Sequence, residues 1–256
     1  MIILKRYFRL LKIEVYKNFK DSMAYPLEFI LNTLIFITVF TAIMFGINKI
    51  GDKSQILSFS LVPIITTVVI VGAQSIRTDI QIGVFEQIYN SCYSIPELII
   101  IRTLVSILFT LPIWFVMIFI ANSIFCSVNL SVLFLITNLV LVIVTGISLS
   151  MILVGLLLRF KKLDSIFNIL NILLIIEVGL PFLALTEVTQ KIIYMIVPFS
   201  GTIACMQSFL NKAATFNFNN ILLISILNTL IYAILSIILY RYFYNETKKN
   251  GTLGVY

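Results

Sequence analysis

The sequence contains no histidine, only 11% of its residues are charged, and it has few cysteines, glycines and prolines. Without histidine, the chain has neither a histidine general base nor a histidine-based metal site. The three cysteines, Cys92, Cys126 and Cys205, have a spacing that fits neither a disulfide framework nor a zinc site, and we expect them to be small apolar packing residues. We therefore expect no metal site and no cofactor bound by this chain.

Catalytic motifs are also missing. The chain has no GxSxG sequence, no P-loop of the GxxxxGK[ST] type, and no pair of acidic residues on one face of a membrane helix. We expect no catalytic activity from the chain by itself, and any use of ATP requires a separate protein. The net charge is +7, and we expect no nucleic acid partner.

Apolar residues make up 60% of the chain, more than the roughly half that is typical of soluble domains. They fall into six blocks of the length, about 20 residues, that crosses a bilayer core as a helix. Strand-length alternation is not seen, which favours helices over a barrel. The predicted spans are 25–47, 56–76, 97–121, 130–158, 165–185 and 219–240. The sequence thus predicts an all-α membrane protein with six transmembrane helices in one domain, 1–256.

The amino-terminal residues 1–22 alternate apolar and basic side chains at helical spacing. This pattern predicts an amphipathic helix that lies in the membrane interface, with its basic face toward anionic headgroups. A soluble helix packed on another protein is the alternative. Charges run through the apolar residues, so we do not expect a secretory signal.

The distribution of basic residues predicts the topology. With six spans and both termini in the cytoplasm, 14 of the 18 lysine and arginine residues lie inside. A seventh span at 192–209, which Pro198 and Gly201 interrupt, would lower that number to 12. We therefore expect six spans, an outer re-entrant segment at 186–218 and a cytoplasmic tail at 241–256.

Local signals mark several helix boundaries. Asp21-Ser22 predicts a break before the first span, with Pro26 in the first turn of the next helix. Pro63 predicts a kink in the second span. The residues 94–97, Ser-Ile-Pro-Glu, form a capping-box pattern that predicts the start of the third span.

Two acidic residues lie within predicted spans, where charge is costly and often functional. Glu177 lies in the outer half of the fifth span, where it either faces a substrate cavity or proton path, or snorkels or hydrogen-bonds within the bundle. Glu28 lies near the cytoplasmic end of the first span, and we expect it to pair with basic residues of the preceding helix.

The polar segment 77–96, between the second and third spans, is long for a connector in so compact a bundle. It has helical character around 82–89. A cytoplasmic helix held between two spans is a rigid lever that presses on a partner and moves both spans together. A solvated loop with helical tendency is the alternative.

The sequence of this segment, GVFEQIYNSCYSIPELIIIRTL, is similar to the corresponding segment of bacterial ABC transporter permeases of the type-2 exporter class. Gly83, Glu86, Gln87 and the pair Pro96-Glu97 match that pattern. The tail KKNGTLGVY resembles the basic, glycine-rich carboxyl terminus of the family, and the expected architecture resembles it along the whole chain.

The resemblance implies that the chain pairs with a second permease, identical or paralogous, and with two ABC ATPase subunits that bind ATP and magnesium. Residues 77–91 would form the coupling helix, with Phe85 and Ile88 as apolar anchors in the ATPase and Glu86 as a charged contact. Gly83 and Gln87 belong to the same coupling set. Cys92 and Tyr93 depart from the small or proline-like residues of the family, which indicates unusual partner specificity.

The function expected from this resemblance is export, across a bacterial plasma membrane, of a hydrophobic small molecule or an amphipathic peptide. The 21 phenylalanines and 11 tyrosines either form an apolar path or are ordinary lipid-facing residues. An ion-driven secondary transporter, with Glu177 as its first candidate residue, is an alternative. A non-transporting accessory or immunity membrane protein is another, although it would not need a coupling helix.

Overall fold

The computed structural model describes residues 2–50, 54–84, 87, 93–126, 131–160, 164–210 and 218–249. Nearly all of these residues are helical and none is in a strand, which confirms the expected all-α class. The elements are α1 (Ile2–Ala24), α2 (Pro26–Ile50), α3 (Ser54–Phe59), α4 (Val62–Thr66), η1 (Thr67–Val71), α5 (Gly72–Ile82), α7 (Ile95–Ile120), η2 (Ala121–Cys126), α8 (Val132–Phe160), α9 (Asp164–Gly179), η3 (Phe182–Ala184), α10 (Glu187–Ile196), α11 (Ser200–Leu210) and α12 (Phe218–Lys249).

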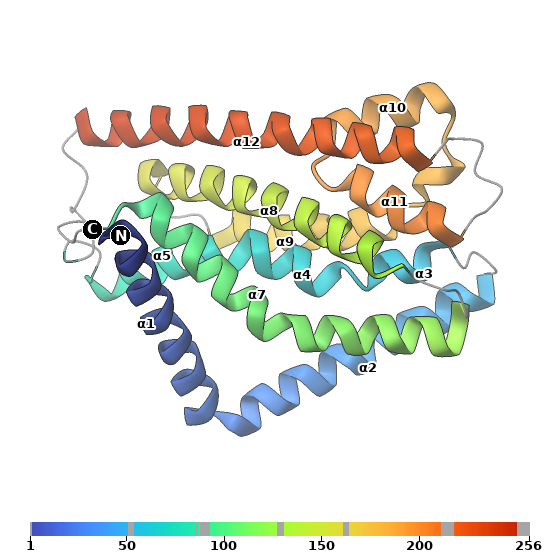
Figure 1. The fold of residues 1–256 in the computed structure, drawn as a ribbon, viewed down its shortest axis with the longest axis horizontal. Coiled ribbons are helices and arrows are strands. Elements are labelled where there is room, and N and C mark those ends of the chain that lie inside the picture. Colours follow the sequence, from blue (N-terminus) through green and yellow to red (C-terminus); the bar gives the residue numbers. More distant parts are fainter. Residues whose placement is uncertain are drawn as a thin grey trace.

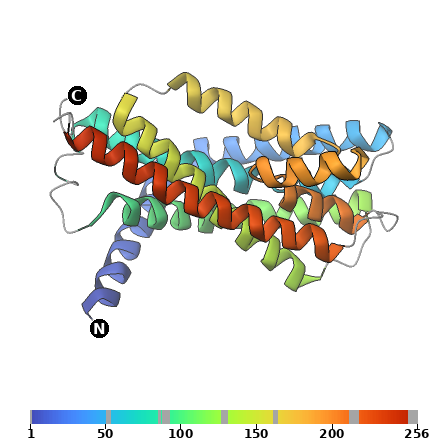
Figure 2. The ribbon, with the colours of Figure 1, turned by 90° about the horizontal axis from the view of Figure 1, so that it is seen from above.

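Four helical stretches are long and apolar enough to cross a membrane: Gln55–Ile82, Ile95–Phe125, Val132–Phe160 and Asn219–Lys249. The apolar parts Thr33–Ile47 of α2 and Ser165–Gly179 of α9 are shorter. These helices run along the long axis of the molecule, whereas α1 leaves the bundle at a steep angle (Figures 1 and 2). The helices identify the chain as a membrane protein.

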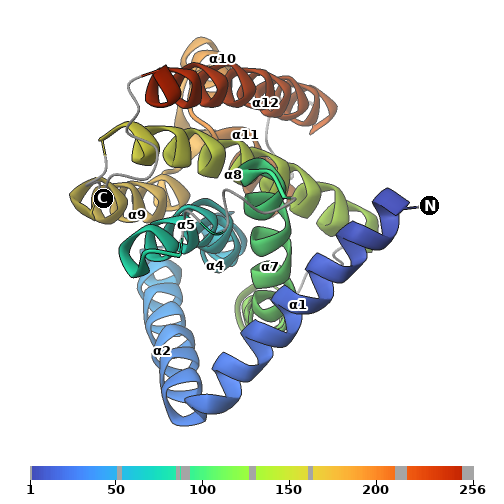
Figure 3. The same ribbon diagram turned by 90° about the vertical axis from the view of Figure 1, so that its left-hand side faces the viewer.

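The second predicted span forms the centre of the bundle. It is built from α3, α4, η1 and α5 in succession, and α7, α8, α9 and α11 pack around it (Figure 3). Leu61, Ile64, Val68 and Ile76 along this stack have no exposed surface. The stack is therefore shielded from lipid by its neighbours, which places it where a displacement would reach most of the other helices.

Pro63 interrupts the central stack, as the sequence predicts. A proline has no N–H to donate and fits the first turn of a helix. Here α3 ends at Phe59, Ser60 and Leu61 form a turn, and Pro63 lies in the first turn of α4. The N–H of Leu61 donates to the carbonyl of Ser58 at 2.9 Å, so the broken segment retains local hydrogen bonds.

Gly72, at the start of α5, is a point of close approach between the central stack and two of its neighbours. A Cβ atom at this position would lie 2.5 Å from Ser150 Oγ on α8 and 2.6 Å from Thr103 Oγ1 on α7. Small residues let membrane helices pack closely where no hydrophobic force drives them together. Glycine is therefore required here for three helices to meet.

Two helix boundaries differ from the sequence predictions. The predicted break at Asp21-Ser22 is wrong, because α1 continues to Ala24 and the chain bends at Tyr25 before α2 begins at Pro26. The side chain of Ser22 donates to the carbonyl of Asn18 at 2.9 Å, a bond within the helix that replaces the capping role expected of it.

The last helix is also longer than predicted, because α12 continues from the sixth predicted span through residues 241–249. This extension packs on α8. Arg159 of α8 pairs with Glu246 at 3.1 Å and lies over the Phe243 ring. A tail that pairs with the neighbouring helix gains contacts that a free polar tail lacks, which explains why the helix continues.

The broken hydrophobic segment before the last helix forms two short helices, α10 and α11. They are separated at Val197–Phe199, around the proline at position 198. Asn228 of α12 donates to three carbonyls at this break, those of Tyr194, Met195 and Val197, at 2.8 to 3.1 Å. The segment is thus divided into two helices, and neither is long enough to span a membrane.

The outer surface of the bundle carries many large apolar side chains. Examples are Leu27 on α2, Leu133 on α8 and Ile238 on α12, each more than 60% exposed. Exposed apolar area of this extent is unusual for a soluble monomer. It fits a bundle whose outer face contacts lipid tails.

Candidate functional site

The start of the predicted coupling segment is a helix end. α5 terminates at Ile82, and Gly83 follows in the left-handed conformation with φ of 79°. Gly83 donates its N–H to the carbonyl of Ile80 at 3.1 Å, and Val84 donates to that of Asp79 at 3.0 Å. Glycine adopts this conformation without the strain that a Cβ brings. Residues 77–82 therefore extend the second span and Gly83 ends this helix, so the helical stretch predicted around 82–89 is interrupted at Gly83 and Val84.

The other predicted coupling residues are only partly described. Gln87 is helical and exposed. Phe85, Glu86 and Ile88 lie outside the described residues, as does the side chain of Glu28. The two helices that flank this segment, α5 and α7, are both described, and so are their contacts with α1.

A buried cluster of three charged residues joins α1, α5 and α7. The Arg102 guanidinium on α7 donates from Nε to Glu14 Oε1 on α1 at 2.9 Å, and from Nη1 to Asp79 Oδ2 on α5. All three residues are less than 10% exposed. Buried charges are costly unless they are paired, and removing one partner leaves the others buried and unpaired. The cluster therefore fixes the relative positions of the three helices.

A second contact fastens α1 to the first turn of α7. Arg6 Nη2 donates to Glu97 Oε2 at 2.7 Å, and the Tyr7 hydroxyl donates to Oε1 of the same carboxylate. This hydrogen bond raises the pKa of Tyr7. Glu97 Oε2 also accepts the Ser94 N–H at 2.8 Å, which confirms the predicted capping box. The Arg6 guanidinium lies 4.9 Å from the centre of the Tyr93 ring.

Arg6 and Glu14 lie on one stripe of α1 with Leu10 between them, at a spacing of four residues. Leu10 packs in an apolar cluster with Leu98 and Ile101 of α7, between the two polar contacts. The helix is thus held along two turns by alternating polar and apolar contacts. The helix before the segment between Gly83 and Tyr93, α5, and the helix after it, α7, are both bonded to α1.

The sequence interpretation did not assign roles to Glu14, Asp79 or Arg102. One signal was available: Arg102 lies five residues inside the third predicted span, and a cation within a span needs a partner. Its two partners come from positions 14 and 79, and nothing in the local sequence pairs them with position 102.

The chain matches no family model. No curated protein and no solved structure shows significant similarity to it. The function of the site must therefore be argued from its geometry and from the sequence.

Glu177, the other predicted site residue, lies near the end of α9 and is 8% exposed. Its Oε1 accepts the Phe199 N–H, at the break between α10 and α11, at 3.1 Å. Glu177 therefore does hydrogen-bond within the bundle, one of the two roles considered for it. It also lines a cavity, as the other interpretation requires.

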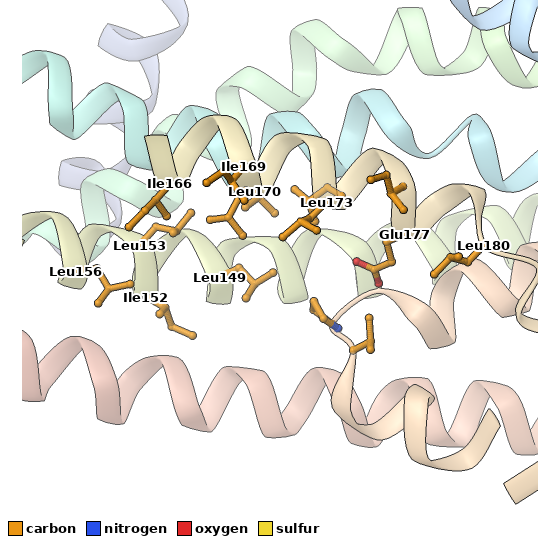
Figure 4. A pocket seen from close by; sticks show the side chains of 15 residues that line it. Leu149, Ile152, Leu153, Leu156, Ile166, Ile169, Leu170, Leu173, Glu177 and Leu180 are labelled. Carbon is orange, nitrogen blue, oxygen red and sulfur yellow. The ribbon is translucent and has the colours of Figure 1, made fainter. Parts of the chain in front are cut away.

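This cavity, the α8–α9 groove, has a volume of about 690 Å³ and walls that are almost entirely apolar. Leu149, Leu153 and Leu156 of α8 form one side, and Ile169 and Leu173 of α9 form the other (Figure 4). The groove exists because α9 packs mainly against α3 and α4 of the central stack, which leaves its side toward α8 open. Figure 4 shows the Glu177 carboxylate at one end of the groove.

Proposed function

We propose that the chain is the membrane-spanning permease subunit of an ATP-driven ABC exporter. It would work with two ABC ATPase subunits, which bind ATP and magnesium, and with a second permease subunit. Its substrate would be a hydrophobic small molecule or an amphipathic peptide. The chain itself would bind and move substrate without catalysing a reaction.

The observation that carries this proposal is the attachment of α1 to both flanks of the segment 84–94. Glu14, Asp79 and Arg102 bond α1 to α5 and α7, and Arg6 and Glu97 bond it to α7 a second time. A force applied to the segment by a partner would move three helices as one body. Because α5 continues into the buried central stack, that motion would reach the turn before Pro63 and the helices around it.

In the proposed topology the chain has six spans, with α2 and α9 as the first and fifth. α2 has 25 residues and reaches the length of a span, whereas α9 has 16 and would need local thinning of the bilayer or help from η3. Both termini and the segment 77–96 would lie in the cytoplasm, and α10 with α11 on the outer face. The excess of basic residues on the proposed cytoplasmic side supports this orientation.

The helix α1 would lie at the cytoplasmic membrane surface. Its outer faces expose both apolar side chains, such as Phe8 and Tyr16, and basic ones, such as Lys12 and Lys17. Amphipathic basic helices of this kind bind anionic interfaces. The same helix would thus contact lipid with its exposed side and the coupling region with its buried side.

Purification tests the proposal. The chain, expressed together with its neighbouring genes and purified in mild detergent, should bring with it a stoichiometric soluble protein that carries a Walker A sequence. The complex should hydrolyse ATP. A chain that purifies alone, from a locus without an ATPase, would contradict the proposal.

An ion-driven secondary transporter is the second candidate, and the observation that favours it is the buried Glu177 carboxylate on the α8–α9 groove. Transport by the chain alone in proteoliposomes, driven by a proton gradient and lost in Glu177→Gln, would support it. Transport that requires ATP and an added ATPase would exclude it.

A further inference from the structure

We infer that the α8–α9 groove binds a long-chain hydrophobic cation, with the cationic group at Glu177 and the apolar chain along α8 and α9. That this molecule is the exported substrate rests on the proposed function. The binding itself follows from the charge and the shape of the groove.

The Glu177 carboxyl group has no counterion among the described residues. Among the described residues, no lysine or arginine forms an ion pair with it, and its one side-chain hydrogen bond is the neutral N–H of Phe199 on Oε1. Oε2 accepts no hydrogen bond from the described part of the chain. By contrast, the buried carboxylates Glu14 and Asp79 are both paired with Arg102. A carboxylate in apolar surroundings gains strongly from a nearby cation, because few water dipoles screen the attraction.

The surroundings of Glu177 select an apolar ligand. Apart from Glu177, every described residue that lines the groove is a leucine, isoleucine, valine or proline. A hydrated ion such as sodium prefers several oxygen ligands, and the groove offers one carboxylate. The cation must therefore carry its own apolar body, as an alkylammonium does.

The length of the groove favours a chain over a compact ring system. Ile166 and Glu177 both line it and are separated by three turns of α9, about 16 Å along the helix axis. Figure 4 shows the apolar side chains following one another along α8 and α9 toward the carboxylate. Because lipid tails also solvate an alkyl chain well, the carboxylate provides the preference for a cation over a neutral lipid.

Binding of radiolabelled dodecyltrimethylammonium to the purified full-length chain tests the inference. The protein is placed in phosphatidylcholine nanodiscs, and dodecanol is used as a neutral competitor of the same length. Glu177→Gln removes the charge and keeps an oxygen that accepts the Phe199 N–H. Glu187→Gln, at the exposed start of α10, is the matched control. Leu173→Trp fills the groove from a half-exposed position.

The wild type and Glu187→Gln should bind the probe saturably with equal affinity. Glu177→Gln should bind at least tenfold more weakly, a loss of about 1.4 kcal/mol. Leu173→Trp should also lose binding, and dodecanol should compete poorly. Fluorescence of Trp114, buried in α7, verifies that each variant other than Leu173→Trp is folded, and helical circular dichroism does so for that one.

Equal binding by Glu177→Gln and the wild type, or equally strong competition by dodecanol, would overturn the inference and identify the groove as a lipid-chain site. The test needs no ATPase, so it separates this inference from the proposed function. Cation binding by a chain that has no ATPase partner would support the site and contradict the export function. An active ATPase complex that does not bind the probe would overturn the site alone.

Discussion

Replacing Arg102 with Met removes the guanidinium between Glu14 and Asp79 while keeping a long side chain in its place. Both carboxylates then remain buried without their cation. Breaking a buried ion pair by removing one partner costs about 3–5 kcal/mol. Since folded domains are stable by only about 5–15 kcal/mol, this is a large fraction of the total.

The charge-free variant Glu14→Gln, Asp79→Asn, Arg102→Met separates the cost of the unpaired carboxylates from the loss of the contacts that Arg102 makes. With no charge left in the cluster, the cost of stranded carboxylates disappears, and replacing a whole buried ion cluster is often close to neutral. We expect this variant to regain at least half of the stability that Arg102→Met loses. We also expect both variants to loosen α1, because the bond between α1 and α7 at Arg102 is missing in each.

Thermal unfolding followed by the fluorescence of Trp114, the one tryptophan, measures the stability of each variant. Maleimide labelling of Leu10→Cys, with the native cysteines replaced by alanine, measures the attachment of α1. Leu10 is 5% exposed, so labelling should be slow in the parent and fast in both cluster variants. Unchanged melting and unchanged labelling in Arg102→Met would refute the claim that the cluster holds α1 in place.

Three further predictions concern packing, coupling and topology. Gly72→Ala should sharply lower the yield of folded protein, because its Cβ would overlap neighbouring side chains, whereas Gly46→Ala, which has open space, should match the wild type or exceed it by up to about 1 kcal/mol in unfolding measurements. Replacing both Phe85 and Glu86 with Ala should leave ATP hydrolysis in the complex but abolish its coupling to export; unchanged transport per ATP would remove the coupling role from this segment. Lys191→Cys should react with a membrane-impermeant maleimide from outside the cell, and labelling only after permeabilisation would invert the proposed topology.

Local features of the structure followed from the sequence where a single physical cause dominates. The helices follow from apolar runs long enough to span a bilayer. The turn before Pro63 follows from the missing proline N–H, and the start of α7 follows from the reciprocal bonds of Ser94 and Glu97. Each of these depends on residues within a few positions of one another.

The features that the sequence did not predict depend on contacts between distant residues. The last helix continues beyond the apolar run because Glu246 meets Arg159 on α8, a partner that local hydropathy does not reveal. Residues 77–82 extend the second span because Asp79 bonds to Arg102, and the helix ends only where Gly83 turns. The Glu14–Arg102 pair, 88 positions apart, lies beyond any local pattern.

The α8–α9 groove was only half predictable. A carboxylate within a span marks Glu177 as a candidate, but the open side of α9 results from its packing on α3 and α4. A sequence pattern gives the apolar faces of a helix and not the neighbour that covers each face.

The central claim, that the segment between the second and third spans contacts an ATPase, is tested most directly by photo-crosslinking from Gln87. Gln87 is exposed, and a photoreactive amino acid at this position in living cells should capture a soluble protein that carries a Walker A sequence. The same amino acid at Ile238, which is exposed on the side of α12 that points away from the bundle, should capture none. Adducts with an ATPase from position 87 alone are the predicted result. Their absence, in cells that export the substrate, would contradict the account.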